Sequence, residues 1–149
     1  MRLLIYNIRY ATGVGPAFHL PVPGAGYLRS SASVLRQITE FIKEQNPDVQ
    51  VIGVHPPSGH DIPGVRSRQA LALTDFFLPD EYDQVLEVPD EESYGLCRRL
   101  HLEESLIAGP SCGLALAGAL RAVPDEPGVL AVVVFPDNAW KYGSSQSTV

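Results

Sequence analysis

Hydrophobic residues recur along the chain in short blocks whose spacing alternates between strand-like and helix-like. Residues 2–8 and 49–55 are compact apolar runs, which are typical of short buried strands. Between them, apolar residues share one helical face at Val34, Leu35, Ile38, Phe41 and Ile42. This spacing predicts a helix over residues 31–45, which Asn46-Pro47 ends. A strand, a helix and a strand in this order predict a parallel βαβ unit.

The second half of the chain continues this alternation. We expect helices near residues 67–77, 90–101 and 111–121, and a strand near 84–88. Residues 129–135 form a continuous apolar run without alternation. Such a run is typical of a central strand that is covered on both faces. Residues 140–149 are predicted to be a polar tail.

Some details of the helix over residues 90–101 can also be predicted. Asp90 is placed to cap the amino end of this helix. The acidic residues after it interact favourably with the positive end of the helix dipole. The buried face is predicted to carry Tyr94, Cys97 and Leu100.

These elements define one fold class. We predict a single α/β domain over residues 1–149, arranged as a three-layer sandwich around a mostly parallel sheet of about four strands. Two loops interrupt the pattern. The Gly- and Pro-rich stretch 11–29 is long for a compact domain, and residues 56–64 follow a predicted strand at its carboxyl end. Open parallel sheets bind ligands at that end.

Composition narrows the class of partner. The net charge of −6 and the pI near 5.1 argue against a general nucleic-acid surface, because phosphate binding needs clustered Lys and Arg. No apolar run approaches the length of a membrane span, and the first residues turn polar too soon for a signal peptide. The two cysteines, Cys97 and Cys112, give no disulfide framework. We therefore expect a cytoplasmic protein with reduced thiols and a small-molecule ligand.

The most informative stretch is residues 104–121, where a Gly109-Pro110 turn leads into a helix of small residues. Ser111 stands where a helix N-cap belongs, and the free N–H groups of a first helical turn favour an acceptor or an anion. Two interpretations stay open at this point. The turn either faces a ligand, or it opens a buried helix with an ordinary serine cap.

Several pieces of the chain resemble the carboxyl-terminal part of the cysteine synthase family, which depends on pyridoxal phosphate and includes cystathionine β-synthase. The matching pieces, in the family's order, are residues 46–56 (NPDVQVIGVHP), 59–65 (GHDIPGV), 83–88 (DQVLEV), 103–120 (EESLIAGPSCGLALAGAL), 132–137 (VVVFPD) and 141–144 (KYGS). The resemblance spans about residues 41–145. It implies an enzyme of sulfur amino-acid metabolism that performs β-replacement on an activated serine.

The resemblance also implies a cofactor site. In the family, the serine that opens the small-residue helix hydrogen-bonds the pyridine nitrogen of the cofactor, and the matching residue is Ser111. A hydroxyl can donate to a neutral pyridine nitrogen without forcing a charge on it. The resemblance adds Gly109, Cys112 and Asp137 as cofactor-side residues. Cys112 could instead be buried packing, and Asp137 could be a cap or loop anchor.

Other parts of that family are not found in this sequence. Lys43 is the first lysine of the chain, and its neighbours do not match the family's Schiff-base motif. The asparagine loop that binds the substrate carboxylate and the loop that binds the cofactor phosphate also have no match, since Gly13-Val14-Gly15 alone is weak evidence. We therefore expect weak cofactor binding and no catalysis by this chain alone. One option for the assembly of this chain is a homodimer.

The first 50 or so residues suggest a second resemblance, to the endonuclease/exonuclease/phosphatase superfamily. It rests on residues 2–10 (RLLIYNIRY), the following Gly- and Pro-rich loop, and residues 38–49 (ITEFIKEQNPDV). It implies that Asn7 helps to organise a Mg²⁺ phosphodiesterase site. The position for the next ligand holds Val54, which cannot bind Mg²⁺. The chain could therefore be a composite with a junction near residues 41–54.

The remaining candidates have simpler interpretations. His55 and His60 flank the loop 56–64, and two histidines without a third ligand predict a solvated loop rather than a metal site. The run Gly109-Pro110-Ser111-Cys112-Gly113 matches the hydrolase pattern G-x-S-x-G. No histidine follows His101, so a hydrolase triad in the usual order is not available. A third hypothesis is an α/β module that only binds.

Overall fold

The computed structural model of this chain describes residues 2–6, 39–72 and 82–142. Its strands are β1 (Arg2–Tyr6), β2 (Gln50–His55), β3 (Gln84–Glu87) and β4 (Leu130–Val134). Its helices are α2 (Arg68–Ala72), α3 (Asp90–Glu103), α4 (Pro110–Ala122) and the 3-10 helix η4 (Ala139–Tyr142), and residues 39–45 are also helical.

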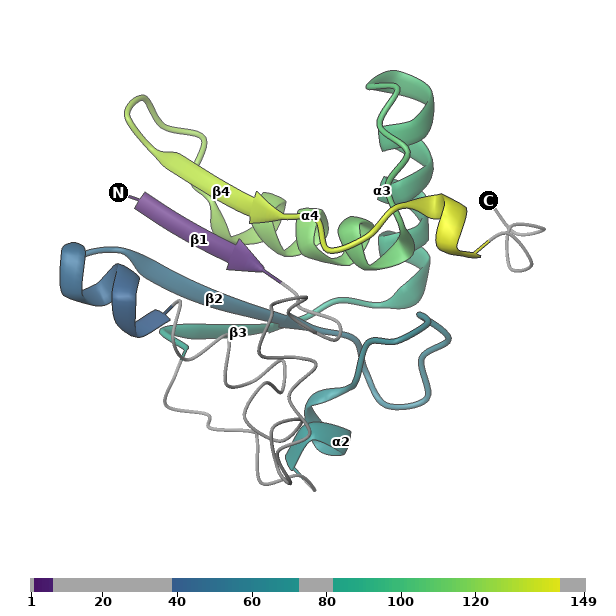
Figure 1. Cartoon of the computed structure of the whole chain (residues 1–149), viewed down its shortest axis with the longest axis horizontal. Coiled ribbons are helices and arrows are strands. Elements are labelled where there is room, and N and C mark those ends of the chain that lie inside the picture. The colour runs from purple at the N-terminus through teal and green to yellow at the C-terminus, as the bar shows by residue number, and fades with distance from the viewer. Residues whose placement is uncertain (1, 7–38, 73–81, 143–149) are drawn as a thin grey trace, which may run out of the picture.

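The four strands form one sheet in the order β3-β2-β1-β4, and every pair is parallel. Figure 1 shows the strands side by side, with all the arrowheads at the same end of the sheet. In the register, Leu4 of β1 lies between Val51 of β2 and Val132 of β4. The amino-terminal strand is therefore an integral part of the sheet. The predicted α/β class and the mostly parallel sheet are confirmed.

Helices cover the sheet in layers. On one face α4 crosses β4, β1 and β2, and α3 packs against α4. The main core lies at this contact, where Ile52 and Val54 of β2 meet Leu114 and Ala117 of α4. On the other face of β2, Val51 packs with Ile42 of the helical residues 39–45 and with Tyr82. The described part of the chain therefore forms three layers around β2.

The small residues of α4 bring its backbone close to the sheet. A Cβ atom built on Gly118 would lie 2.2 Å from Cγ2 of Val54, so only glycine fits without a shift of that side chain. Glycine destabilises a helix, and this close contact with β2 explains why the helix nevertheless contains it.

The prediction for the last strand was wrong. Residues 129–135 were expected to be central and covered on both faces, but β4 is at the end of the described strand order. Alternate residues point outward, and Leu130 and Val132 are 58% and 51% exposed. Ala131 and Val133 pack against the core under α4. The run shows no alternation because β4 is apolar on both faces, although α4 covers only one of them.

Three other predictions need correction. Phe41 is 63% exposed, because residues 39–45 contact the sheet through Ile42 instead. Asp90 is the first residue of α3 rather than its cap, which is Pro89, and its Oδ2 accepts a hydrogen bond from the Asp61 N–H at 2.5 Å. On α3, Ser93 rather than Tyr94 is buried with Cys97 and Leu100.

The remaining element predictions are confirmed within one or two residues at the ends that the structure describes. The helix predicted over 31–45 is observed over 39–45, and the one predicted over 67–77 over Arg68–Ala72. Residues 31–38 and 73–77, the loop 11–29 and Asn7 lie outside the described residues.

Candidate functional site

The turn that opens α4 differs from the prediction in one respect. Gly109 is the N-cap, with extended backbone (φ −80°, ψ 167°), and Pro110 is the first helical residue. Proline suits this position because its missing N–H would have no partner in the helix anyway. Ser111 is therefore the second helical residue and not the cap, so its hydroxyl is available for another partner.

That partner is Asp137, which follows the carboxyl end of β4. The Ser111 hydroxyl donates to Oδ1 of Asp137 at 2.8 Å, and the Tyr142 hydroxyl donates to Oδ2. The main-chain oxygen of Asp137 accepts from the Cys112 thiol at 3.1 Å and from the Gly109 N–H at 3.4 Å. The prediction of Asp137 as a loop anchor is confirmed. Its cofactor-side role remains a prediction.

The glycine at position 109 is required by this anchor. A Cβ atom built on Gly109 would lie 2.3 Å from Oδ1 of Asp137 and 3.0 Å from the Tyr142 ring. A larger residue would push the carboxylate away from the Ser111 hydroxyl. The structure thus brings together all four predicted cofactor-side residues: Ser111, Gly109, Cys112 and Asp137.

Residues 137–142 run beside the turn and hold it in place. Ala108 and Asn138 form an antiparallel bridge, and the Ala139 N–H donates to the Ile107 carbonyl at 3.3 Å. Tyr142 is buried at the end of η4, so the predicted polar tail begins later than residue 140. Tyr142 was not predicted as a site residue. The match of residues 141–144 to the family could have indicated it.

The opposite side of the turn is held by α3. The Ala108 carbonyl accepts from Nε2 of His101 at 2.7 Å and from the Cys97 thiol at 3.1 Å. Because a carbonyl oxygen only accepts, Nε2 of His101 carries a proton in this contact. Ala108 is therefore fixed from two directions, immediately before the residues that present Ser111.

The two thiols are packing groups with weak hydrogen-bonding ability. Burial, with smaller contributions from the nearby Cys112 and Asp137, raises the pKa of Cys97 to about 11. Burial also raises the pKa of Cys112, although hydrogen bonds involving Asp137 and Gly109 act in the opposite direction. Thiolates are the reactive form of cysteine, so both groups are unreactive at neutral pH. Of the two interpretations of Cys112, the structure favours buried packing.

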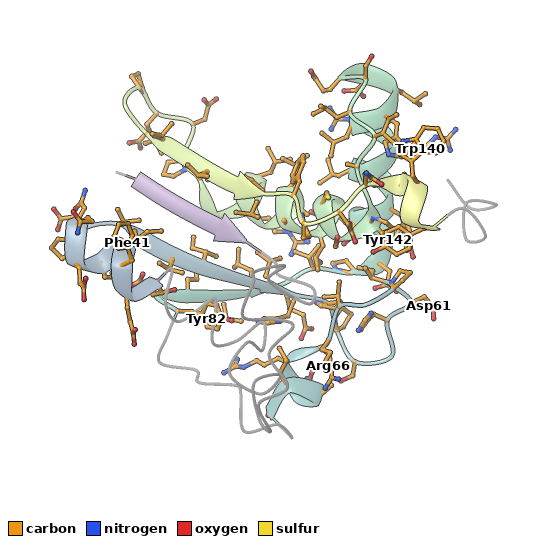
Figure 2. All side chains as sticks on the ribbon, in the orientation of Figure 1. Phe41, Asp61, Arg66, Tyr82, Trp140 and Tyr142 are labelled. Atoms are coloured by element: carbon orange, nitrogen blue, oxygen red, sulfur yellow. The ribbon has the colours of Figure 1, made fainter. Side chains whose placement is uncertain are left out.

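Lys43 lies far from this turn. Its Nζ contacts both carboxylate oxygens of Asp83, at 2.8 and 2.6 Å, just before β3 begins. Asp83 also accepts the Val51 N–H near the start of β2, so Lys43 belongs to the amino edge of the sheet. Figure 2 shows Phe41 of the same helix at the left and Tyr142 at the right, beyond the strand arrowheads. Lys43 and Ser111 are therefore at opposite edges.

The histidines of the second loop are placed differently from the prediction. His55 is buried, at 8% exposure, and its ring meets the Tyr82 ring edge-on with centroids 6.1 Å apart. Burial lowers the pKa of His55, and Arg68 lowers it further, against a hydrogen bond to the Arg66 backbone that raises it. The prediction of a solvated loop was therefore wrong for His55. His60 is half-buried, and its Nδ1 accepts the Ile62 N–H at 3.2 Å.

The described residues give no support for the Mg²⁺ site. Within residues 39–72 and 82–142, no three His, Cys, Asp or Glu side chains are grouped so that they could hold a metal ion. Val54, at the position where the phosphatase resemblance needs a glutamate, is 1% exposed and packs under α4. That position is therefore part of the hydrophobic core.

Comparison with known proteins identifies one group of relatives. No known protein-family model matches the chain. Cysteine synthase B of Salmonella typhimurium is 32% identical over 108 residues, which are 72% of this chain and 36% of that protein. The O-acetylserine dependent cystathionine beta-synthase of Bacillus subtilis is 30% identical over 138 residues, covering 86% of this chain and 43% of the relative. The chain is similar to the cysteine synthases. It spans less than half the length of these relatives.

Solved structures agree on the fold. The O-acetylserine dependent cystathionine beta-synthase of Helicobacter pylori superposes with a TM-score of 0.69 at 22% identity, covering 100% of this chain and 44% of that structure. An O-acetyl serine sulfhydrylase of Entamoeba histolytica gives 0.68 at 18% identity, covering 97% and 39%. Because the first match includes the amino-terminal strand, this strand fits the cysteine synthase fold. The phosphatase resemblance and the composite it implied are not supported.

Among the helices in the described part of the chain, none combines the length and the apolar character that crossing a bilayer requires.

Proposed function

We propose that this chain is the part of a cysteine-synthase-like enzyme that binds the ring of pyridoxal phosphate. The observation that supports this most directly is the Ser111–Asp137 hydrogen bond at the amino end of α4, within the stretch that resembles the family. Gly109 and Cys112 complete the ring-side residues. The proposed reaction is β-replacement on an activated serine in sulfur amino-acid metabolism, for which the bound cofactor supplies an electron sink.

The described residues fit the ring end of this cofactor. Ser111 offers a hydroxyl at the start of a 13-residue helix, and its neighbours Asp137 and Tyr142 are polar rather than apolar. Ser111 has no exposed surface, so a ring can reach its hydroxyl only when the residues around it open. Lys43 does not fit the covalent role, because it is paired with Asp83 at the other edge of the sheet.

The proposal therefore has two parts: ring binding, and no β-replacement by this chain alone. The ring-binding probe is pyridoxine 5′-phosphate, which lacks the aldehyde and cannot react with lysines. We expect weak binding by NMR titration, and about tenfold weaker binding for Ser111→Ala, the loss of one hydrogen bond. Ser93→Ala is the matched control, since Ser93 is equally buried but donates to the Pro89 carbonyl at 3.1 Å. Equal affinities of the Ser111 and Ser93 variants would contradict the ring site.

The second part is tested with pyridoxal phosphate and borohydride. We expect no reducible adduct on Lys43 and no formation of cysteine from O-acetylserine and sulfide. An adduct on Lys43, identified by mass spectrometry, would overturn this part. If ring binding is absent as well, the chain is better described by the alternative of a different α/β binding module.

We also propose that the chain forms a homodimer. The outward residues of β4, including Leu130 and Val132, give an apolar surface at the end of the described sheet. Large exposed apolar patches mark interaction sites in soluble proteins. Light scattering should give the mass of a dimer, and Val132→Lys should reduce it to that of a monomer. A monomeric mass for the unaltered chain would exclude this proposal.

A further inference from the structure

Three donor atoms converge between α3 and the turn before α4. The Cys97 sulfur lies 3.7 Å from Nε2 of His101, and the Ala108 carbonyl oxygen lies 3.1 Å from that sulfur and 2.7 Å from that nitrogen. Cys97 and His101 are four residues apart on α3, so their side chains share one face of the helix. A thiol, an imidazole and a carbonyl oxygen therefore face one small volume.

The separation of the sulfur and the nitrogen matches that of two ligands of one metal ion. Cysteine sulfur lies about 2.3 Å and histidine nitrogen about 2.0 Å from a bound Zn²⁺ ion, which places the two donors about 3.6 Å apart at a tetrahedral angle. The observed distance of 3.7 Å is close to this value. A cation of this size can therefore bind between Cys97 and His101 with little movement of α3.

The number of available ligands decides which ion suits this pair. Zn²⁺ normally takes four ligands in proteins, and the described residues offer no group of three His, Cys, Asp or Glu side chains that could hold a metal ion. Thiolate selects soft ions such as Cu⁺, and Cu⁺ is stable with only two or three ligands. We propose that Cys97 and His101 bind a soft monovalent ion of the Cu⁺ type, with the Ala108 carbonyl oxygen as a weak third ligand.

Binding replaces the protons of this cluster with the ion. The Cys97 thiol loses its proton to solvent as the sulfur–metal bond forms, and the neutral His101 ring moves its proton from Nε2 to Nδ1. One proton is released for each ion that binds. Because burial raises the pKa of Cys97, this release opposes binding, and we expect a moderate affinity. His101 is half-buried, so the ion can enter past its ring.

The test is a titration of the purified chain with Cu⁺ under argon, in competition with a coloured Cu⁺ chelator. Loss of an outer-shell partner alone typically costs about 10–100-fold in metal affinity. We therefore expect Cys97→Ser to bind Cu⁺ at least about 100-fold more weakly, and His101→Gln at least about tenfold more weakly. Serine and glutamine can both still donate to the Ala108 carbonyl, so each variant keeps a donor that holds the turn.

Two matched variants separate this site from unspecific binding of Cu⁺ to any thiol or histidine. Cys112 is as buried as Cys97, but its thiol donates to the main-chain oxygen of Asp137. Nδ1 of His60 accepts from the Ile62 N–H. Cys112→Ser and His60→Gln should therefore keep the affinity of the unaltered chain. X-ray absorption of the bound ion in the unaltered chain should show one sulfur and one nitrogen as its nearest ligands.

Three results would overturn the proposal. They are no binding of Cu⁺, equal affinities of the Cys97 and Cys112 variants or of the His101 and His60 variants, and coordination of the ion by sulfur alone. Circular dichroism checks that each variant is folded, and the absorption measurement on the unaltered chain decides the question where one is not. The experiment contains no pyridoxine 5′-phosphate, so its outcome does not depend on the proposed ring site.

Discussion

The backbone of α4 at Gly113 lies directly on the carbonyl oxygen of Ser93 in α3. A Cβ atom built on Gly113 would be 1.9 Å from that oxygen and 2.9 Å from the Cys97 nitrogen. Both obstructing atoms belong to a helix backbone, so they cannot move aside as a flexible side chain could. The two helices can pack at this distance only with glycine at position 113.

Gly113→Ala should therefore be strongly destabilising. Separating α3 from α4 would disturb the contacts of Ser93 and Cys97, and overpacking of this kind costs about 3 kcal/mol or more. Gly95→Ala is the matched control in α3, because a Cβ at Gly95 meets nothing within 4 Å. It should stabilise the helix by about 0.5–1 kcal/mol, since alanine is the better helix former. Urea unfolding of both variants gives the comparison, and equal effects would contradict the packing argument.

The sequence predicted the strands and their parallel sheet better than it predicted which strand lies at the edge of that sheet. Apolar periodicity identified every described strand, because short apolar runs and helical spacing are local signals. The edge position of β4 could not be predicted in this way, since the pairing of Arg2–Tyr6 between β2 and β4 is a long-range relationship. An apolar run alone does not show whether a second layer covers it.

At the candidate site, too, local signals were predicted and long-range contacts were not. Ser111 and Asp137 were identified from resemblance, but their hydrogen bond depends on a contact between residues that are 26 positions apart. Tyr142 was assigned to a tail because nothing in the local pattern indicated η4. His55 was assigned to a loop because the Tyr82 ring that packs on it follows far along the chain. In each case the missing information was tertiary.

His55 should make the stability of the fold depend on pH. The pKa of His55 is lowered in the folded state, chiefly by burial. As the pH falls, His55 therefore takes up a proton in the unfolded chain before it does so in the folded chain. Stability should therefore be complete above the unfolded pKa of about 6.5 and should decrease as the pH falls below it. The melting temperature measured between pH 8 and pH 5 tests this prediction. His55→Gln should reduce the slope in that range, and an unchanged slope would show that another group is responsible.

Asp83 should make stability depend on pH in the same direction as His55, but in a lower pH range. Burial raises the pKa of Asp83, but hydrogen bonds from Lys43 and Val51 and the Lys43 charge together lower it below 3.8. Its contribution is present above pH 3.8 and is lost as the pH falls through the folded pKa. Asp83→Asn should lower the unfolding midpoint at pH 7. It should also reduce the further loss of stability that the unaltered chain shows when the pH falls below 4.

The exposed pair of Arg99 and Glu103 provides the control for this measurement. These side chains form an i,i+4 salt bridge at 2.9 Å and are 63% and 52% exposed. Exposed pairs contribute little because solvent screens them. Glu103→Gln should therefore leave the unfolding midpoint at pH 7 close to that of the unaltered chain. If Glu103→Gln lowers the unfolding midpoint as much as Asp83→Asn does, the hydrogen bond from the Val51 N–H to Asp83 contributes nothing to stability.

The two faces of β4 should respond differently to the same substitution. Val133 packs against the core under α4, whereas Val132 points outward and is 51% exposed. Threonine has nearly the shape of valine and favours strands equally well, so the change adds essentially one hydroxyl group. Val133→Thr should cost about 1–3 kcal/mol because it desolvates that hydroxyl. At protein concentrations low enough to keep the chain monomeric, Val132→Thr should stay within about 0.5 kcal/mol. Chemical unfolding measures both values, and a greater loss for Val132→Thr would show that the outer face of β4 is covered.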